Sequence, residues 1–348
     1  MEFIYEYGLF LAKSATVVVA IIVVLVAMTG IMMRGKQRTA EGHIELKHLN
    51  ERLQEMRESL QHALLDKHEL KRLAKAEKVK AKAEAKAGKK SRQESGESGR
   101  KPAVFVLNFA GDIRAQAVHQ LREEITAVLA VAGPHDQVVA RLESSGGMVH
   151  AYGLGASQLQ RVKDKGIRLT ACVDKVAASG GYMMACVADR ILSAPFAVIG
   201  SIGVLAQLPN FHRLLKKHDI DYEMLTAGEY KRTLTVFGEN TDKDRAKVKQ
   251  DLEDIHDLFK TFVRENRPAV DINEVATGEV WYGRQALERR LIDELKTSDA
   301  FLIDLCETAE VYEVRYVEKK PLQERLGLNI ETALERLLQR WLGRNTHY

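Results

Sequence analysis

The sequence predicts an α/β domain built on a largely parallel sheet, preceded by a membrane anchor and a charged helical tether. From residue 103 onward, short apolar runs alternate with amphipathic helical stripes, which is typical of parallel β-α units. The chain has 348 residues, of which 45% are hydrophobic, so it can bury a sizeable core. We expect an anchor with its flanks over residues 1–38, a tether and linker over 39–100, and the α/β domain over 101–348.

Residues 14–33 form the predicted anchor, because all of them are uncharged and most are Val, Ile, Ala or Met. As a helix they span about 30 Å, the thickness of a bilayer core. A cleaved signal peptide is the alternative, but its apolar stretch is usually about 7–15 residues long, and Glu2 and Glu6 precede this one. Basic residues within 34–38 follow the span, so the positive-inside rule favours a cytoplasmic domain.

The predicted tether combines a heptad-like helix with a basic run and a linker. Ten Lys and Arg residues within 71–92 are typical of a solvated helix or of contact with anionic lipid, and residues 93–99 are typical of a flexible linker. Before them, apolar residues follow the 3,4 spacing of a coiled coil or of one amphipathic helix docking on its own domain or on lipid. These residues are Leu46, Leu49, Leu53, Met56 and Leu60.

Charge and cysteine content exclude several classes of protein. The formal net charge is +4, but residues 1–100 carry +6 and residues 101–348 carry −2. A near-neutral domain argues against a nucleic-acid-binding core. Three cysteines without a C-x-x-C pair exclude a disulfide scaffold and a zinc knuckle, and Cys172 and Cys186 are expected to be free and buried.

The first elements of the domain alternate in the order strand, helix, strand, helix, strand. A continuous apolar run over 103–109 is typical of a strand that is buried on both faces. An apolar stripe over 118–129 predicts a helix. Two further short apolar runs, 138–142 and 167–173, predict strands, and 152–165 predicts the helix between them.

The later elements are less regular. A short helix is predicted over 182–188, and residues 222–226 resemble a strand. Apolar residues at helical spacing predict a long amphipathic helix over 242–265 and another over 322–342, which ends the chain.

Three glycine-rich segments follow predicted strands, where ligands gather in open α/β sheets. They are Ser-Ser-Gly-Gly at 144–147, Ala-Ala-Ser-Gly-Gly-Tyr at 177–182 and Gly-Ser-Ile-Gly-Val at 200–204. Ser179 lies between a strand and a helix, so its hydroxyl is close to N–H groups that can stabilise an oxyanion. The alternative is an ordinary N-cap serine. The N–H groups of 146–147 can also approach a ligand closely, or the two glycines can simply form a tight turn.

A serine nucleophile needs a base, and no histidine stands out for that role. Lys231, in a loop before the long helix, is a second possibility, since a lysine acts as a base once burial has lowered its pKa from about 10.4. A solvated lysine is the ordinary alternative. The histidines of the domain fall mostly on predicted helices and include His119, His135, His150, His212, His218 and His256.

Taken together, these motifs resemble the signal peptide peptidase A family (S49), which are membrane-bound serine peptidases with a Ser–Lys dyad. The resemblance covers about residues 100–310. The matching segments are 177–182, 200–204, 228–231, 280–287 and 291–295.

The resemblance implies a ClpP/crotonase-like fold of repeated ββα units, and it implies roles by position. Ser179 corresponds to the nucleophile and Lys231 to the general base. Ser201 corresponds to the serine that orients the lysine amine. The family implies no metal or cofactor.

The resemblance also assigns an oxyanion hole to the N–H groups of Gly180 and of Gly147 or Gly146. Two positions depart from the family pattern. Ser145 stands where the family usually has proline, which loosens the turn, and Arg290 stands where it usually has glycine.

The resemblance further implies peptide or unfolded-protein substrates, a single span in a bacterial inner membrane and no nucleic-acid partner. Family members commonly place the catalytic part outside, whereas the flanking charges favour inside. Half-length relatives form rings in which the serine of one protomer meets the lysine of its neighbour, so a homo-oligomer with shared sites is expected. The alternatives are an inactive membrane scaffold, a crotonase-type acyl-CoA enzyme using Glu143 and, least favoured, a Ser-His-Asp peptidase.

Overall fold

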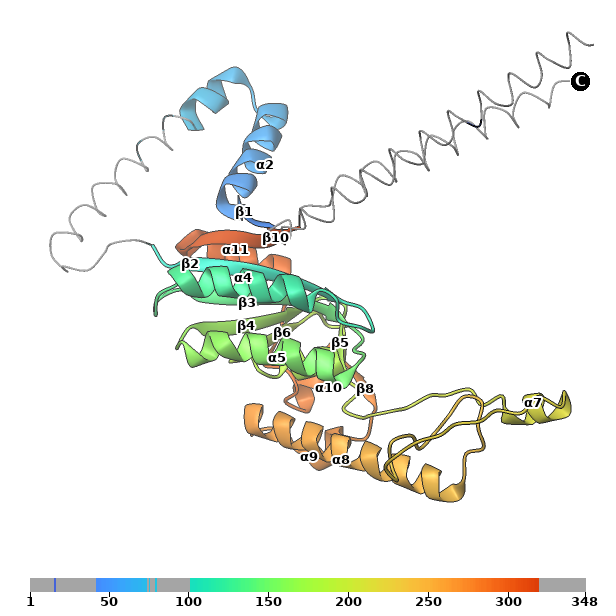
Figure 1. Cartoon of the computed structure of the whole chain (residues 1–348). Helices are drawn as coiled ribbons and strands as arrows, with labels where there is room; N and C mark the ends of the chain where they lie inside the picture. The colour runs from blue at the N-terminus through green and yellow to red at the C-terminus, as the bar shows by residue number, and fades with distance from the viewer. Residues whose placement is uncertain (1–15, 17–41, 74, 76–78, 80–100, 319–348) are drawn as a thin grey trace, which may run out of the picture. The chain divides into compact units, whose positions relative to one another are not determined.

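The computed structural model describes residues 16, 42–73, 75, 79 and 101–318 (Figure 1). Apart from Thr16, the predicted anchor lies outside the described residues, and so does the predicted helix over 322–342. Among the described residues, no helix is both long enough and apolar enough to cross a membrane. Ile44–Tyr316 forms one compact unit, and the description below concerns that unit.

A central sheet dominates the unit and confirms the predicted mixed α/β class. The strands along its main path are hydrogen-bonded in the order β1-β10-β2-β3-β4-β6-β9, and every pairing from β10 to β9 is parallel. The three predicted strands are all present, as β2, β3 and β4. The bounds are β1 His43–His48, β2 Ala103–Gly111, β3 Gln137–Ser144, β4 Arg168–Val173, β6 Arg190–Ser193, β9 Glu294–Leu295 and β10 Glu310–Val317.

Both faces of this sheet are covered by helices. Along β2, Phe105 and Leu107 join the core under α4 and α5, while Val104 and Val106 join the core under α11 (Figure 1). This alternation explains why the apolar run is continuous, since neighbouring side chains point to opposite faces. The helices are α2 Leu49–Leu64, α4 Val118–Val131, α5 Val149–Asp164, α6 Gly180–Ala185, α7 His212–Lys217, α8 Asp242–Asn266, α9 Ile272–Val275, α10 Gly283–Glu288 and α11 Ser298–Thr308.

Three short strands extend one end of the sheet into a second layer. They are β5 (Val176–Ala178), β7 (Val198–Gly200) and β8 (Val280–Tyr282). β5 pairs in parallel with the last residue of β3 and with β7, and β8 closes the layer antiparallel to β7. The carboxyl ends of β3, β5 and β7 therefore meet, and each of them leads into one of the three glycine-rich segments.

The expected heptad seam is only partly helical, because Leu46 lies on strand β1 and α2 begins at Leu49. The helix is docked at its first turn. The Asn50 side-chain amide donates hydrogen bonds to the carbonyl oxygens of Cys306 (3.0 Å) and Ala309 (2.9 Å) and accepts one from the Val311 N–H (2.8 Å). No residue of α2 is buried, and Leu60 is 63% exposed.

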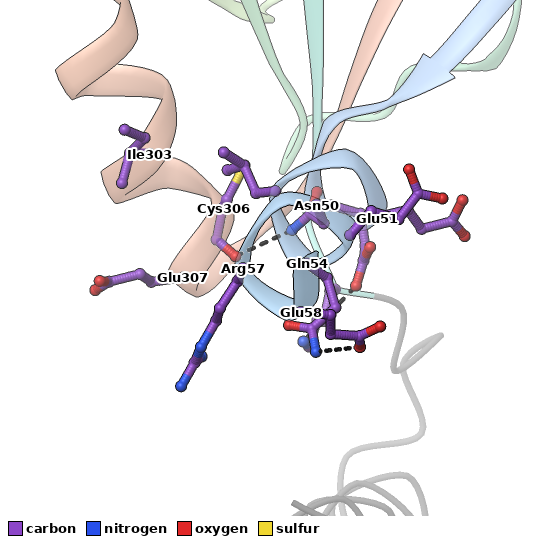
Figure 2. Close-up of a pocket in the computed structure, with 12 residues that line it drawn as sticks. Asn50, Glu51, Gln54, Arg57, Glu58, Ile303, Cys306 and Glu307 are labelled. Carbon is purple, nitrogen blue, oxygen red and sulfur yellow. Dashed lines mark hydrogen bonds and ion pairs between the residues drawn. The ribbon is translucent and has the colours of Figure 1, made fainter. Parts of the chain in front are cut away.

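An open groove lies between α2 and α11, and Figure 2 shows the side chains that line it. Its walls are mostly polar and include Glu51, Gln54, Glu58 and Glu307. Cys306 also lines it, but burial raises the pKa of that thiol, which disfavours the reactive thiolate. None of the three glycine-rich segments reaches this groove.

Residues 204–241, which we call the arm, leave the sheet after β7 and return at α8 (Figure 1). None of these residues is buried, and Leu225 is 94% exposed. The strand expected over 222–226 is absent, because this segment pairs with no other strand within the described residues. The aromatic ring of Phe237 packs against those of Phe211 and Tyr222 instead.

Arg290 occupies a left-handed backbone conformation, with φ of 60°. Such a φ costs a non-glycine residue about 1–2 kcal/mol, and a glycine at this position avoids that cost. Part of the gain in stability is lost again, because glycine has more conformational freedom in the unfolded chain. We therefore expect Arg290→Gly to raise the midpoint of thermal unfolding by about 1–3 °C. The backbone carbonyl that accepts from Arg267 is kept. A lower midpoint would mean that the Arg290 side chain itself stabilises the fold.

Glu124 is a buried acid, 4% exposed, on α4. Its Oε1 accepts from the Tyr316 N–H (2.9 Å), whereas Oε2 has no partner. Burial raises the pKa of Glu124, so the folded protein holds a proton that the unfolded chain has already released. The free energy of unfolding should therefore fall as pH rises from about 4.5 to the raised pKa, by at most about 1.4 kcal/mol per pH unit, and then level off. Chemical denaturation between pH 4 and 8 tests this, and Glu124→Gln should remove that slope.

Candidate active site

The glycine-rich segments after β3, β5 and β7 meet around Ser179. Ser144 is in register with Ala177, and Ala178 is in register with Gly200. The Ser179 N–H donates to the Gly200 carbonyl at 2.7 Å, which joins the second segment to the third. The prediction that these turns follow strands is therefore confirmed, and the structure adds that the strands are neighbours.

The backbone of Ser179 is strained, with φ of 51° and ψ of −119°. A non-glycine residue in such a conformation costs about 1–3 kcal/mol, and strain of this kind is concentrated at functional sites. Ser179 occupies the N-cap position of α6, but its side chain makes no capping hydrogen bond. The ordinary N-cap interpretation is therefore wrong, because within the described residues the hydroxyl does not cap α6.

The two glycines of the first segment differ in what their N–H groups do. The Gly146 N–H donates to the Ser144 hydroxyl at 3.0 Å, so it is already engaged. Gly146 has φ of 90°, and a side chain there would come within 2.8 Å of the Ser179 Cβ. Gly147 is exposed and makes no such bond to Ser144. Gly180 begins α6, so its N–H has no partner within the helix.

Ser201 lies on the third segment, directly after the carbonyl that accepts from Ser179. It is also left-handed, with φ of 51°, and its N–H donates to the Glu279 carbonyl at 2.7 Å. The next carbonyl, that of Ile202, contacts Nε2 of His256 at 3.1 Å. The structure thus brings Ser179, Ser201 and the glycines into one cluster of turns.

A small, mainly apolar pocket opens beside Ser179. Helix α8 forms one of its walls, and sequence reasoning missed this contribution. The apolar spacing of α8 predicts a buried face but does not tell which turn that face covers. The pocket is lined by Gly147, Val149, Ser179, Gly180, Met183, Gly203, Val204, Ile255 and Phe259.

Lys231 is not part of this cluster. It lies on the arm, its side chain is exposed, and its backbone N–H donates to the Gly228 carbonyl at 3.1 Å. No hydrogen bond within the described residues joins its amine to Ser179 or Ser201. The structure of one chain therefore assembles the serines and the N–H donors without the lysine.

The other candidate groups do not complete the site either. Glu143 forms an exposed ion pair with Lys175 at 3.0 Å and does not line the pocket beside Ser179. His256 contacts the third segment through a backbone carbonyl, and within the described residues no ion pair links it to a carboxylate. Cys172 and Cys186 are free and buried, as expected, and burial raises the pKa of each thiol to about 12.

Comparison with known proteins identifies the class to which this fold and site belong. Residues 2–159 match the family description "Peptidase family S49 N-terminal", and residues 161–312 match "Peptidase family S49". Together these ranges cover most of the chain. The chain therefore belongs to peptidase family S49, which supports a protease function.

Individual relatives narrow the comparison to one kind of S49 peptidase. A protein of Haemophilus influenzae named "Probable protease SohB" is 48% identical over 96% of this chain and 95% of its own length. Two proteins with the same name come from Buchnera aphidicola. The one from the Acyrthosiphon pisum subspecies is 54% identical over 68% of this chain and 71% of its length, and the one from Schlechtendalia chinensis is 45% identical over 87% and 99%.

Proposed function

We propose that the protein is a membrane-anchored serine endopeptidase that hydrolyses unfolded or membrane-derived peptides with a Ser–Lys dyad. The observation that carries this proposal concerns Ser179. Its backbone is strained, its side chain makes no capping hydrogen bond, and it lines one pocket together with Gly147 and Gly180, whose N–H groups are the proposed donors. A nucleophile needs its hydroxyl presented to the substrate and donors placed for the developing oxyanion.

In the proposed mechanism, neutral Lys231 takes the proton of the Ser179 hydroxyl as Oγ attacks the substrate carbonyl carbon. The N–H groups of Gly180 and Gly147 stabilise the resulting oxyanion, since that of Gly146 is engaged by Ser144. The protonated lysine then gives its proton to the leaving amine, which completes the acyl-enzyme. Water, deprotonated by the same lysine, hydrolyses the ester and restores Ser179, while Ser201 orients the lysine amine.

We propose that each site is shared between two protomers of a homo-oligomer. The arm that carries Lys231 has no buried residue, whereas a lysine base must be desolvated to lose its proton near neutral pH. A neighbouring chain whose Ser179 cluster receives the arm would bury the apolar side chains of the arm and the amine together. The same contact would complete the dyad.

The order of the strands in the two layers supports a finer fold assignment. β4 leads through β5 into α6, and β6 leads into β7, so a strand of the main sheet is twice followed by a strand of the second layer. We propose that these are the repeated ββα units of a ClpP/crotonase-like fold.

We also propose that residues 1–38 anchor this peptidase by a single span in a bacterial inner membrane. The charges that flank the span favour a catalytic domain in the cytoplasm, whereas family members commonly place it on the outer side of the membrane.

The pocket beside Ser179 supports a preference for apolar substrate residues. Met183, Ile255 and Phe259 offer no charge or hydroxyl to a substrate side chain. The pocket is small, so a short apolar side chain fits the space better than an aromatic one.

Hydrolysis of an unfolded fluorescent protein by the detergent-purified full chain tests the proposal. We expect the wild type to cleave it, and Ser179→Ala and Lys231→Ala to lose activity while keeping the oligomer size. Equal inactivity of all three proteins would favour the scaffold alternative. Full activity of Lys231→Ala would assign the base to another residue.

A further inference from the structure

A chain of hydrogen bonds runs behind the first glycine-rich segment and is not used by the mechanism above. The Gly146 N–H donates to Ser144 Oγ at 3.0 Å, and that hydroxyl is hydrogen-bonded to the hydroxyl of Tyr152. The Tyr152 hydroxyl donates to the Asp112 carbonyl at 2.7 Å. Ser144 is 3% exposed and Tyr152 is fully buried, so water does not replace these bonds.

The number of hydroxyl hydrogens determines which group donates in each hydrogen bond of this network. Each hydroxyl has one hydrogen, and that of Tyr152 is given to Asp112. The Ser144 hydrogen is then free for the Tyr152 oxygen or for the Gly111 carbonyl at 3.2 Å, while the Ser144 oxygen accepts from Gly146. All donors of the network are satisfied, and such buried networks fix one arrangement of the backbone.

The same tyrosine also contacts the second segment. A Cβ built on Gly180 would lie 2.4 Å from Cγ of the Tyr152 ring, so the backbone of Gly180 rests directly on that ring. Phe109 packs edge-on against the ring, with centroids 6.2 Å apart, and restricts its movement. One side chain on α5 therefore touches the turn before Gly147 through its hydroxyl and touches Gly180 through its ring.

We propose that Tyr152, acting through Ser144, is a positioning residue that sets the distance between the two N–H donors of the oxyanion hole. The hydrogen bond from Gly146 to Ser144 restrains the turn at Ser145, where the family usually has proline. The proposal rests on the proposed function, because it concerns the N–H groups of Gly147 and Gly180 that the mechanism uses.

Burial supports this role at alkaline pH. It raises the pKa of Tyr152, and the negative charge of the Asp112 carboxylate raises it further, so the hydroxyl keeps its hydrogen at moderately alkaline pH. The groups that face this hydroxyl are the Ser144 hydroxyl and the backbone carbonyl of Asp112, with the Asp112 carboxylate nearby. The positioning network therefore stays intact at moderately alkaline pH.

Tyr152→Phe removes one hydroxyl and tests the proposal, with Tyr182→Phe as the matched control. Tyr182 is equally buried, but its hydroxyl donates to the Leu291 carbonyl at 3.0 Å, away from the oxyanion hole. We expect Tyr152→Phe to lower kcat about tenfold with KM unchanged, less than the 100-fold or more that follows loss of an oxyanion donor. Tyr182→Phe should keep the kcat of the wild type, and equal kcat values for the two variants would overturn the proposal.

Ser145→Pro provides a rescue that a merely structural role for Tyr152 would not show. If the network serves to restrain this turn, proline in the Tyr152→Phe background should return kcat to within about threefold of the wild type, because its ring fixes φ. Failure of the rescue, with both variants folded and of the same oligomer size, would contradict the proposal.

Amide hydrogen exchange gives a readout that needs no activity. In the Ser179→Ala background, we expect Tyr152→Phe to speed exchange at the Gly146 amide about tenfold or more, and Tyr182→Phe to leave it unchanged. Unchanged exchange in Tyr152→Phe would overturn the positioning role even in an active enzyme. Faster exchange, together with a wild-type protein that shows no hydrolytic activity, would support the effect of Tyr152 on this turn and reject the proposed function.

Discussion

Mixing Ser179→Ala with Lys231→Ala should restore hydrolysis that neither variant has alone. In one chain the serine lies in the cluster of turns and the lysine lies on the exposed arm, with no hydrogen bond between them. If each site takes its serine from one protomer and its lysine from the next, random mixing in a ring leaves about one site in four with both residues. Co-expression of the two variants with different affinity tags, followed by tandem purification, yields the mixed oligomers for a peptidase assay.

The double variant Ser179→Ala/Lys231→Ala, co-expressed with the wild type, is the control. It can occupy ring positions, but it contributes neither residue to a site. If the mixed oligomers of the two single variants stay inactive while the wild type with the same tags is active, each chain uses its own lysine. Such a result would require the arm to move towards Ser179 of the same chain.

Asp293→Ala should destabilise the fold by about 3–5 kcal/mol, because it leaves the buried guanidinium of Arg267 without its charge partner. Arg267 is 8% exposed and donates to both oxygens of Asp293, at 2.7 and 2.9 Å. Asp293 Oδ2 also accepts from the Ile191 N–H at 2.7 Å. Burial lowers the pKa of Arg267, but the Asp293 hydrogen bonds and the charge interactions with Asp293, Tyr182 and Cys186 together raise it, so the arginine stays charged.

Thermal unfolding followed by circular dichroism measures this effect, and we expect the midpoint to fall by about 6–20 °C. Glu143→Ala is the matched control, since it breaks an ion pair whose side chains are 71% and 50% exposed. An exposed pair contributes about 1 kcal/mol or less. A loss of similar size in both variants would mean that the Arg267–Asp293 pair is no more important than a surface pair. Replacing both members, as Arg267→Met/Asp293→Leu, should recover most of the loss.

The sequence predicts the buried elements well because burial on two faces leaves an unmistakable apolar pattern. Residues 103–109, which are apolar apart from Asn108, are such a run and form β2. The predictions were wrong where strand formation depends on a pairing partner from a distant part of the sequence. Leu46 follows the spacing of a helix, but its segment pairs with β10 and becomes a strand. Residues 222–226 resemble a strand, but within the described residues they have no neighbouring strand to pair with.

The sequence predicts which turns form the candidate site, but not which backbone N–H groups in those turns are available to a ligand. Strand ends followed by glycines point to Ser179, Ser201 and the pair at 146–147. Which of the two glycines has its N–H free depends on a hydroxyl that turns back from Ser144, and sequence does not show that geometry. Tyr152 is predicted only as a residue on a helix. The anchor and the helix over 322–342 stay predictions.

The exposed arm gives the proposed enzyme a dependence on its own abundance. If sites are shared as proposed, a protomer alone would be inert, and newly made chains would pass through the cell without cutting their neighbours. Hydrolysis would then begin only once protomers associate, and the number of working sites would rise more steeply than the number of chains. Holding all protomers in one thin layer by an N-terminal span would lower the copy number at which that threshold is crossed.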